Sequence, residues 1–343
     1  MTITSHHNRA LSVAAAVLAL VPVTLALPAG ADAASRKVDG VRAELKRGTL
    51  EVDGGGRPNA VTLRLKQDDA SRIQVDVGDD RSADFEFARG DVHAISVAMG
   101  SGRDSVHIDD GNGAFTDTIP TTIAGGNGDD LLNGGQGAER LSGGGGDDSV
   151  DGGRGNDSAD LGRGADSFTW DPGEGSDVID GGSGRDTMVF NGAGANEDVA
   201  LTANGGRLTF FRNPASVTMD TDDVETVDFN ALGGTDRIGV DDLSATDVRQ
   251  LNVDLAASLG GDAPDRAADS VILTGTDGDD TIHVGGNGSG ADVTGLAPAV
   301  SIEHADANDP KDSLSINTLV GADNVFVAGV AGVLQVLVDG APV

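Results

Sequence analysis

The 343-residue chain has no cysteine, no tyrosine, a single tryptophan and only 3% aromatic residues. Without cysteine it can form neither disulfides nor thiolate metal sites, although small secreted domains commonly depend on disulfides. Large apolar side chains for a conventional core are also scarce. These absences leave a hydrogen-bonded sheet ladder, or a metal ion bound by oxygen ligands, as the means of cross-linking the chain.

Basic residues are few as well, with 23 Lys and Arg against 56 Asp and Glu, so the net charge is −33. A surface this acidic repels nucleic-acid phosphates and anionic lipid headgroups, and it attracts cations. We therefore expect cations, and not nucleic acids, as partners. High acidity with few aromatic residues is typical of a disordered chain unless the sequence contains internal order.

The first 34 residues have the pattern of a secretory signal peptide. The apolar run "LSVAAAVLALVPVTLALP" is followed by the small-residue segment "AGADAAS", which contains an A-x-A cleavage site. A membrane anchor is the alternative, but two prolines interrupt the run. No later segment is apolar for long enough to span a bilayer, so we predict no membrane span and an extracellular, secreted protein.

Between residues 125 and 189 the sequence repeats every nine residues. The seven units read GGNGDDLLN, GGQGAERLS, GGGGDDSVD, GGRGNDSAD, LGRGADSFT, PGEGSDVID and GGSGRDTMV, and the insertion Trp170-Asp171 precedes the sixth. Position 4 is always glycine. Position 6 is always acidic, at Asp130, Glu139, Asp148, Asp157, Asp166, Asp177 and Asp186. Position 8 is always apolar, at Leu132, Leu141, Val150, Ala159, Phe168, Ile179 and Met188.

Each column of the repeat has a structural meaning. Glycine at positions 1, 2 and 4 allows a tight turn with positive φ and close backbone contacts. Positions 7 to 9 suit a three-residue strand whose central side chain points inward. We therefore predict that two units close one coil and that coils stack with parallel strand pairing. The position 6 carboxylates then stack too, and they repel one another unless a cation lies between them.

Calcium fits such a site best among common metal ions. It takes six to eight oxygen ligands in flexible geometry, whereas magnesium prefers a small octahedral cage. Soft or zinc-like sites have no support, because there is no cysteine and the four histidines after the leader are scattered.

The run closely resembles the hemolysin-type (RTX) calcium-binding nonapeptide repeat of secreted bacterial proteins, G-G-x-G-x-D-x-U-x. The resemblance implies a parallel β-roll that binds several Ca²⁺ ions between turns two repeats apart, through the position 6 acids and turn carbonyls. Two departures are that Glu139 is longer than Asp and that the Trp170-Asp171 insertion is expected to break the roll. The ligands that the resemblance implies are Asn127, Asp129, Asp130, Glu139, Asp147, Asp148, Asn156, Asp157, Asp166, Asp177 and Asp186.

A diluted pattern continues outside the tandem repeats. Segments 95–108, 227–240, 271–284 and 314–327 align without gaps, with apolar residues at their first, third, twelfth and fourteenth places. Each has Asp at its tenth place and is predicted to form strand, tight turn, strand. These aspartates are either turn formers without metal or further ligands. Among them we predict a metal ligand at Asp280, in "GTDGDD".

The predicted fold is all-β, a parallel β-roll or β-helix solenoid with less regular β flanks; β-sandwich-like packing is the alternative for the flanks. The predicted parts are a signal peptide (1–34), an N-terminal strand-rich flank (35–124), the calcium-binding β-roll (125–189) and a C-terminal repeat region with degenerate G-x-D-x-I turns (190–343). A helix is also considered for "DDLSATDVRQLNVDLA", residues 241–256.

No catalytic motif is found. The sequence contains no H-E-x-x-H and no G-x-S-x-G, and Glu303-His304 has no second histidine nearby. We therefore expect no enzyme but a secreted calcium-binding β-solenoid, which folds on extracellular Ca²⁺ and acts as a structural or interaction module. Its expected partners are calcium ions and cell-surface or matrix glycans or proteins. The alternative is an extracellular polysaccharide-acting enzyme on a β-helix scaffold, because a glycosidase carboxylate pair could be hidden among so many acids.

Overall fold

A computed structural model describes residues 37–306 and 312–343, so the predicted signal peptide lies outside the described residues. These residues are nearly all β-strand, with two short 3₁₀ helices, η1 (Arg89–Asp91) and η2 (Asp110–Asn112). Within these two ranges there is no helix long and apolar enough to cross a membrane. The helix considered for 241–256 is wrong: the segment contains strand β22 (Gln250–Asp254), where Leu251 and Val253 alternate inward as a strand requires.

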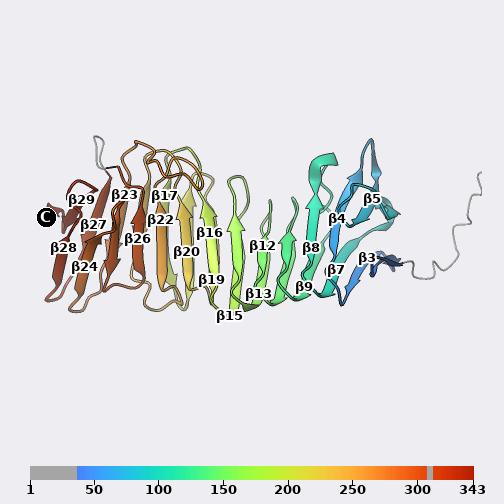
Figure 1. Cartoon of the computed structure of the whole chain (residues 1–343), viewed down its shortest axis with the longest axis horizontal. Coiled ribbons are helices and arrows are strands. Elements are labelled where there is room, and N and C mark those ends of the chain that lie inside the picture. The colour runs from blue at the N-terminus through green and yellow to red at the C-terminus, as the bar shows by residue number, and fades with distance from the viewer. Residues whose placement is uncertain (1–36, 307–311) are drawn as a thin grey trace, which may run out of the picture. The chain divides into compact units, whose positions relative to one another are not determined.

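The strands form two sheets, and through the tandem repeats successive strands alternate between them (Figure 1). The order across sheet A is β1 (Lys37–Val38), β2 (Val41–Lys46), β3 (Thr49–Gly55), β7 (Ala94–Ser101), β9 (Thr121–Asn127), β11 (Arg140–Gly145), β13 (Ser158–Gly164), β15 (Val178–Gly184), β19 (Val217–Asp222), β18 (Arg207–Asn213), β17 (Asp198–Asn204), β21 (Arg237–Val240), β23 (Ser270–Thr274), β27 (Ser313–Asn317), β29 (Gln335–Val338) and β30 (Ala341–Pro342). The order across sheet B is β28 (Asn324–Ala328), β24 (Thr281–Gly286), β25 (Ala291–Thr294), β26 (Ala299–Glu303), β22, β20 (Thr226–Asn230), β16 (Thr187–Asn191), β14 (Ser167–Trp170), β12 (Ser149–Asp151), β10 (Leu131–Asn133), β8 (Ser105–Asp109), β4 (Ala60–Lys66), β5 (Asp69–Val77) and β6 (Phe85–Ala88).

Two nine-residue units close one coil, as predicted. Leu132 on β10 pairs with Val150 on β12, and Val150 pairs with Phe168 on β14, all in parallel. The alternate units give the same ladder in sheet A, where Leu141 pairs with Ala159. Each coil therefore contributes one strand to each sheet, and the all-β parallel solenoid is confirmed.

The position 8 side chains form the core between the sheets. All seven are buried, none more than 3% exposed, and the residues on either side of them are more exposed. Complete burial of a side chain such as Leu132 or Val150 stabilises the fold by about 1.5–3 kcal/mol. This core is only a narrow stack of side chains, so stability grows with the number of stacked coils.

The insertion does not break the roll, so that prediction is wrong. Strands β14 and β16 pair in register, with Phe168 opposite Met188 and Trp170 opposite Phe190. The indole of Trp170 is fully buried and stacks on Phe190, with ring centroids 4.1 Å apart and planes 7° apart. The extra length is accommodated because Trp170 extends β14 and contributes a large ring to the core.

Parallel pairing continues into both flanks. The pairs β3–β7–β9 precede the tandem repeats, and β21–β23–β27–β29 follow them. All four aligned segments form strand, turn, strand as predicted, for example β7 and β8 or β20 and β21. The flanks are less regular because antiparallel strands interrupt the coils, as in β17–β18–β19 and β24–β25–β26.

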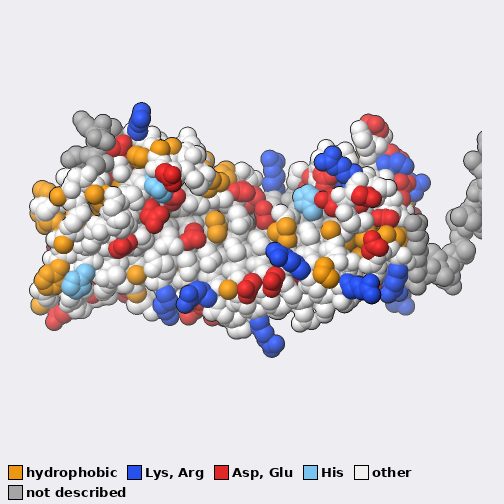
Figure 2. All heavy atoms as spheres, in the orientation of Figure 1, with side chains coloured by type: hydrophobic (Ala, Val, Ile, Leu, Met, Phe, Trp, Pro, Cys, Tyr) orange, Lys and Arg blue, Asp and Glu red, His pale blue; other side chains and the backbone are white. Residues whose placement is uncertain are grey.

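Apolar side chains are exposed near the C-terminal end of the chain, where they gather in Figure 2. Leu319, Val320, Phe326 and Val343 are each more than half exposed. Phe326 belongs to β28, the outermost strand of sheet B. No further strand of the described residues covers this last coil.

Candidate calcium-binding turns

The acids at position 6, together with acids of the flanking coils, come together in columns that follow the two edges of the solenoid. Each acid ends a turn, directly before a strand and two residues before that strand's buried side chain. Turns leading from sheet A to sheet B supply the A-to-B column: Asp104, Asp130, Asp148, Asp166, Asp186 and Glu225. The opposite edge carries the B-to-A column, Glu139, Asp157 and Asp177, and a C-terminal column, Glu197, Asp236, Asp269 and Asp312.

One carboxylate oxygen of most column acids accepts a backbone hydrogen bond from the coil before it. The backbone N–H of Asp104 donates to Asp130 Oδ1 at 2.7 Å, and that of Asp130 donates to Asp148 Oδ1 at 2.8 Å. On the other edge, the N–H of Glu139 donates to Asp157 Oδ1 at 2.7 Å. Successive coils are thus joined at the turns, where the strand ladder itself ends.

The second oxygen of most column acids is buried and accepts no hydrogen bond from the described residues. Asp130, Asp148, Asp157 and Asp166 are each only 2% exposed. A buried carboxylate oxygen without a partner is costly, and it needs either a proton or a cation. The unpartnered oxygens are Oδ2 of Asp104, Asp130, Asp148, Asp157, Asp166, Asp177, Asp186 and Asp236, Oε1 of Glu139 and Oε2 of Glu197.

Glycine at position 1 leaves space for this second oxygen. A Cβ atom on Gly143 would lie 2.5 Å from Asp148 Oδ2, and one on Gly152 would lie 2.5 Å from Asp157 Oδ2. Such distances are too short for any real side chain. The free oxygen of the acid therefore points back into its own turn.

Burial makes the columns difficult to ionise without a counter-charge. Burial, reinforced by the neighbouring Asp177 and Glu139 carboxylates, raises the pKa of Asp157 to about 9. Burial, with Asp166 and Asp130 as negative neighbours, likewise raises the pKa of Asp148 to about 7. A bound cation would remove this penalty and displace the protons.

The donor set fits calcium. It consists of oxygen atoms only. Buried carboxylate oxygens that lack partners lie beside the carbonyl groups of closely packed turns, and a hard cation requires oxygen ligands of this kind. No thiolate is available, so a soft metal has no ligands here. The structure thus groups seven sequence-predicted ligands in two columns, one along each edge of the tandem repeats. They are Asp130, Glu139, Asp148, Asp157, Asp166, Asp177 and Asp186.

The other predicted ligands lie on the outside of the turns. Asn127, Asp129, Asp147 and Asn156 are exposed. Three of them accept hydrogen bonds from the next coil: the Asp147 N–H donates to Asp129 Oδ1 at 3.1 Å, and backbone N–H groups likewise donate to Asp147 Oδ1 at 2.8 Å and to Asn156 Oδ1 at 3.0 Å. Their side chains therefore form an outer ladder apart from the buried columns, and their role as metal ligands stays a prediction.

Asp280 differs from the column acids. The Thr276 N–H donates to its Oδ2 at 2.8 Å, and the Thr276 hydroxyl donates to its Oδ1 at 3.0 Å. Both of its oxygens are thus occupied within its own turn. Asp104 and Asp236, at the same place of the aligned segments, keep an unpartnered oxygen and are better placed to bind a cation.

Sequence reasoning missed several column members. Glu197 is position 6 of a further unit, GAGANEDVA at 192–200, which again follows a two-residue insertion, Phe190-Asn191. Its Val199 is fully buried at position 8. Asp269 and Asp312 lie outside the nine-residue register, but both precede serine and then a buried apolar residue, the same local pattern as Asp148-Ser-Val.

A basic residue neutralises the first acid of the C-terminal column. Arg212 on β18 is 4% exposed, and its Nε donates to Glu197 Oε1 at 2.7 Å. Its guanidinium also lies 5.2 Å from the ring centroid of Trp170. The guanidinium of Arg212 thus supplies a positive charge to this column just after the tandem repeats.

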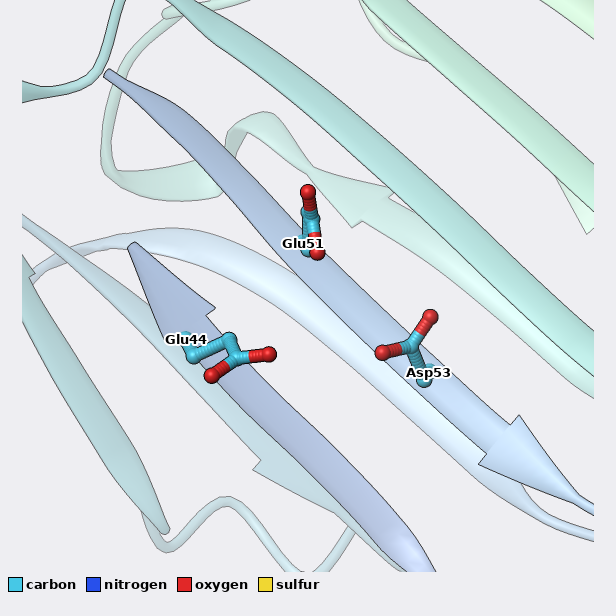
Figure 3. A group of neighbouring side chains, drawn as sticks. All are labelled: Glu44, Glu51 and Asp53. Atoms are coloured by element: carbon cyan, nitrogen blue, oxygen red, sulfur yellow. The ribbon is translucent and has the colours of Figure 1, made fainter. Parts of the chain in front are cut away.

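Three further groups of acids have carboxylate oxygens close enough to share an ion. Glu44, Glu51 and Asp53 form the group drawn in Figure 3, on the neighbouring strands β2 and β3. Basic side chains already balance it: Arg42 lies 2.8 Å from Asp53, and Lys46 lies 2.6 Å from Glu51. This group is a surface ion-pair network.

The second group, Asp222, Asp223 and Asp247, also has basic partners. Arg207 lies 2.9 Å from Asp222, and Arg249 lies 3.8 Å from Asp247. The third group, Asp151, Asp171 and Glu174, forms no ion pair with a basic residue of the described chain.

Fold and site together define a parallel β-solenoid whose turns are built around stacked, buried carboxylates. Residues 122–138, 133–168 and 173–194 match the family model of the RTX calcium-binding nonapeptide repeat (4 copies). These segments, which make up less than half of the chain, therefore have the sequence of RTX calcium-binding nonapeptide repeats. A comparison of the whole chain with curated proteins found no match.

Proposed function

We propose that this protein is exported and folds on extracellular calcium, and that the loaded solenoid acts as a structural or interaction module without a catalytic role. The observation that carries the proposal is the set of buried column carboxylates whose second oxygen has no partner among the described residues. Without a cation these negative charges oppose the stacking of coils; with calcium between them, the same charges join the coils.

The calcium requirement suits folding after export. Extracellular calcium modules bind with dissociation constants of about 10⁻⁴–10⁻³ M, far above the free calcium of the cytosol. The N-terminal leader pattern supports the same route. Proposed partners of the loaded form are cell-surface or matrix glycans or proteins, which its acidic exterior would contact through bound calcium or through its scattered basic side chains.

The experiment is far-UV circular dichroism of the purified protein in excess chelator and at rising calcium concentration. Millimolar calcium should produce the β-sheet spectrum and reduce the hydrodynamic radius, and magnesium at the same concentration should do so weakly. An unchanged β-sheet spectrum in chelator would contradict calcium-dependent folding. A glycan-binding and hydrolysis screen on the loaded protein then separates an interaction module from a polysaccharide-acting enzyme.

A further inference from the structure

The turn between β14 and β15 is two residues longer than a regular turn, and it carries carboxylates of its own. Asp171 belongs to the insertion and Glu174 is at position 3 of the next unit. Asp151, at position 9 one coil earlier, lies beside them. One oxygen of each of these three carboxylates lies within 4.8 Å of the other two.

Hydrogen bonds hold each of the three carboxylates by one oxygen. The Gly153 N–H donates to Asp151 Oδ1 at 2.8 Å, and the Asn191 amide donates to Asp171 Oδ1 at 2.7 Å. The Asp171 N–H donates to Glu174 Oε2 at 2.7 Å. The second oxygen of each accepts no hydrogen bond from residues 37–306 and 312–343, so it is available to a ligand.

A fourth carboxylate closes the same turn. Asp177 is 1% exposed, and its Oδ1 accepts the Asp157 N–H at 2.8 Å. Its Oδ2 is buried and has no partner among the described residues. Asp177 is a negative neighbour of both Asp151 and Glu174, so it lies close to this group of acids.

No ion pair balances these four acids. The ion pairs of the described residues include none with Asp151, Asp171, Glu174 or Asp177. The other two acidic groups both have Arg or Lys partners. A turn that fixes four carboxylates by one oxygen each, and leaves the other four oxygens without an ion-pair partner, is arranged for a cation.

We propose that Asp151, Asp171 and Glu174, beside the column acid Asp177, form a calcium site that the two-residue insertion adds to the nine-residue pattern. The proposal rests on the calcium binding proposed above for the columns. Calcium binds oxygen at about 2.3–2.6 Å, which places opposite ligands about 4.6–5.2 Å apart, comparable with the spacing of these carboxylates. The insertion thus adds a site at the coil where it was expected to remove one.

Trp170 provides a local reporter of this site. It is the only tryptophan of the chain, and its indole N–H donates to the Gly175 carbonyl at 2.8 Å, inside the same turn. Terbium, an oxygen-binding stand-in for calcium, emits when a nearby tryptophan is excited. Tryptophan-sensitised terbium emission therefore reports on ions bound close to the insertion.

The test compares Glu174→Gln and Asp151→Asn with the matched control Asp160→Asn. Asp160 is also at position 9 but is exposed. We expect each site variant to weaken the terbium binding seen through Trp170 by at least about 10-fold and to lose one calcium ion in native mass spectrometry, while the control changes neither. Circular dichroism in saturating calcium verifies that all variants fold.

The outcomes separate the two proposals. If the wild-type protein neither binds calcium nor folds with it, the proposed function fails. If the wild-type protein folds with calcium, but Glu174→Gln and Asp151→Asn keep its ion count and its terbium emission, the insertion site is wrong and the column sites stand.

Discussion

Asp130 and Asp148 occupy the same place in successive coils, and the backbone N–H of the first donates to the carboxylate of the second at 2.8 Å. The other oxygen of Asp148 is buried and has no partner among the described residues. One side chain therefore joins two coils through a hydrogen bond and offers a charged oxygen to a cation. The effect of changing it should depend on calcium.

Replacing Asp148 by Asn separates these two roles, because the amide oxygen can still accept the Asp130 N–H while the charge is lost. In chelator the variant should be more stable than wild type, since it no longer buries a negative charge. In calcium it should be less stable, with a weaker calcium affinity. Asp160→Asn, at an exposed position, should change neither. Chemical unfolding of each protein with and without calcium gives the answer, and a loss of stability in both conditions would rule out a metal role for Asp148.

Acid should partly replace calcium. Asp157 has its pKa raised from 3.8 to about 9 by burial first and by its negative neighbours second, so the folded, metal-free chain binds more protons than the unfolded chain between these values. The resulting stability is fully present below pH 3.8 and is lost as the pH rises through about 9. In chelator the protein should therefore be more stable at pH 5 than at pH 8. Saturating calcium should flatten or reverse this trend, because calcium displaces the protons. Unfolding curves at both pH values measure it, and a metal-free stability that increases toward pH 8 would contradict the buried columns.

The same substitution, to Asp, should destabilise the fold strongly at Val150 and be tolerated at Ser149. Val150 is 1% exposed between Leu132 and Phe168 of the apolar ladder, whereas Ser149 is exposed. Val150→Asp should lower the free energy of unfolding by at least about 4 kcal/mol, because it buries an unpaired charge. Ser149→Asp should change it by about 0.5 kcal/mol or less. Calcium titrations monitored by Trp170 fluorescence compare the two variants. A larger loss of stability for Ser149→Asp would mean that the assigned inward and outward faces of this strand are reversed.

Arg212 should be required for the stability of the fold whether or not calcium is present. Its guanidinium and Glu197 form a buried ion pair, so Arg212→Met leaves an unpaired charge and should cost about 3–5 kcal/mol of unfolding free energy. The control is Arg237→Met, which breaks an exposed pair with Asp198 and should cost about 1 kcal/mol or less. Unfolding of both variants in saturating calcium tests this. Equal losses would mean that the burial of the Arg212 pair contributes nothing.

The nine-residue period is sufficient to predict the coil. One turn and one short strand require glycine at fixed positions, an apolar residue at position 8 and an acid at position 6. These requirements are local, and every unit of the repeat meets them. The parallel pairing of Leu132 with Val150 and the burial of both follow from that repetition. So does the stacking of the acids, because residues that share position 6 must come to the same place in every coil.

The features that the period does not predict depend on distance in space between residues far apart along the chain. Trp170 interrupts the nine-residue pattern, and its stacking partner Phe190 reaches it only when the next coil is in place. Asp269 and Asp312 join a column from irregularly spaced coils, 43 residues apart, and no fixed period can find them. Arg212 reaches Glu197 because β18 folds back antiparallel to β17, a long-range pairing. The repeating coil thus follows from the amino-acid sequence alone, since its causes are local. Which charges face one another across coils is set by the folded chain, because electrostatic partners depend on proximity in space.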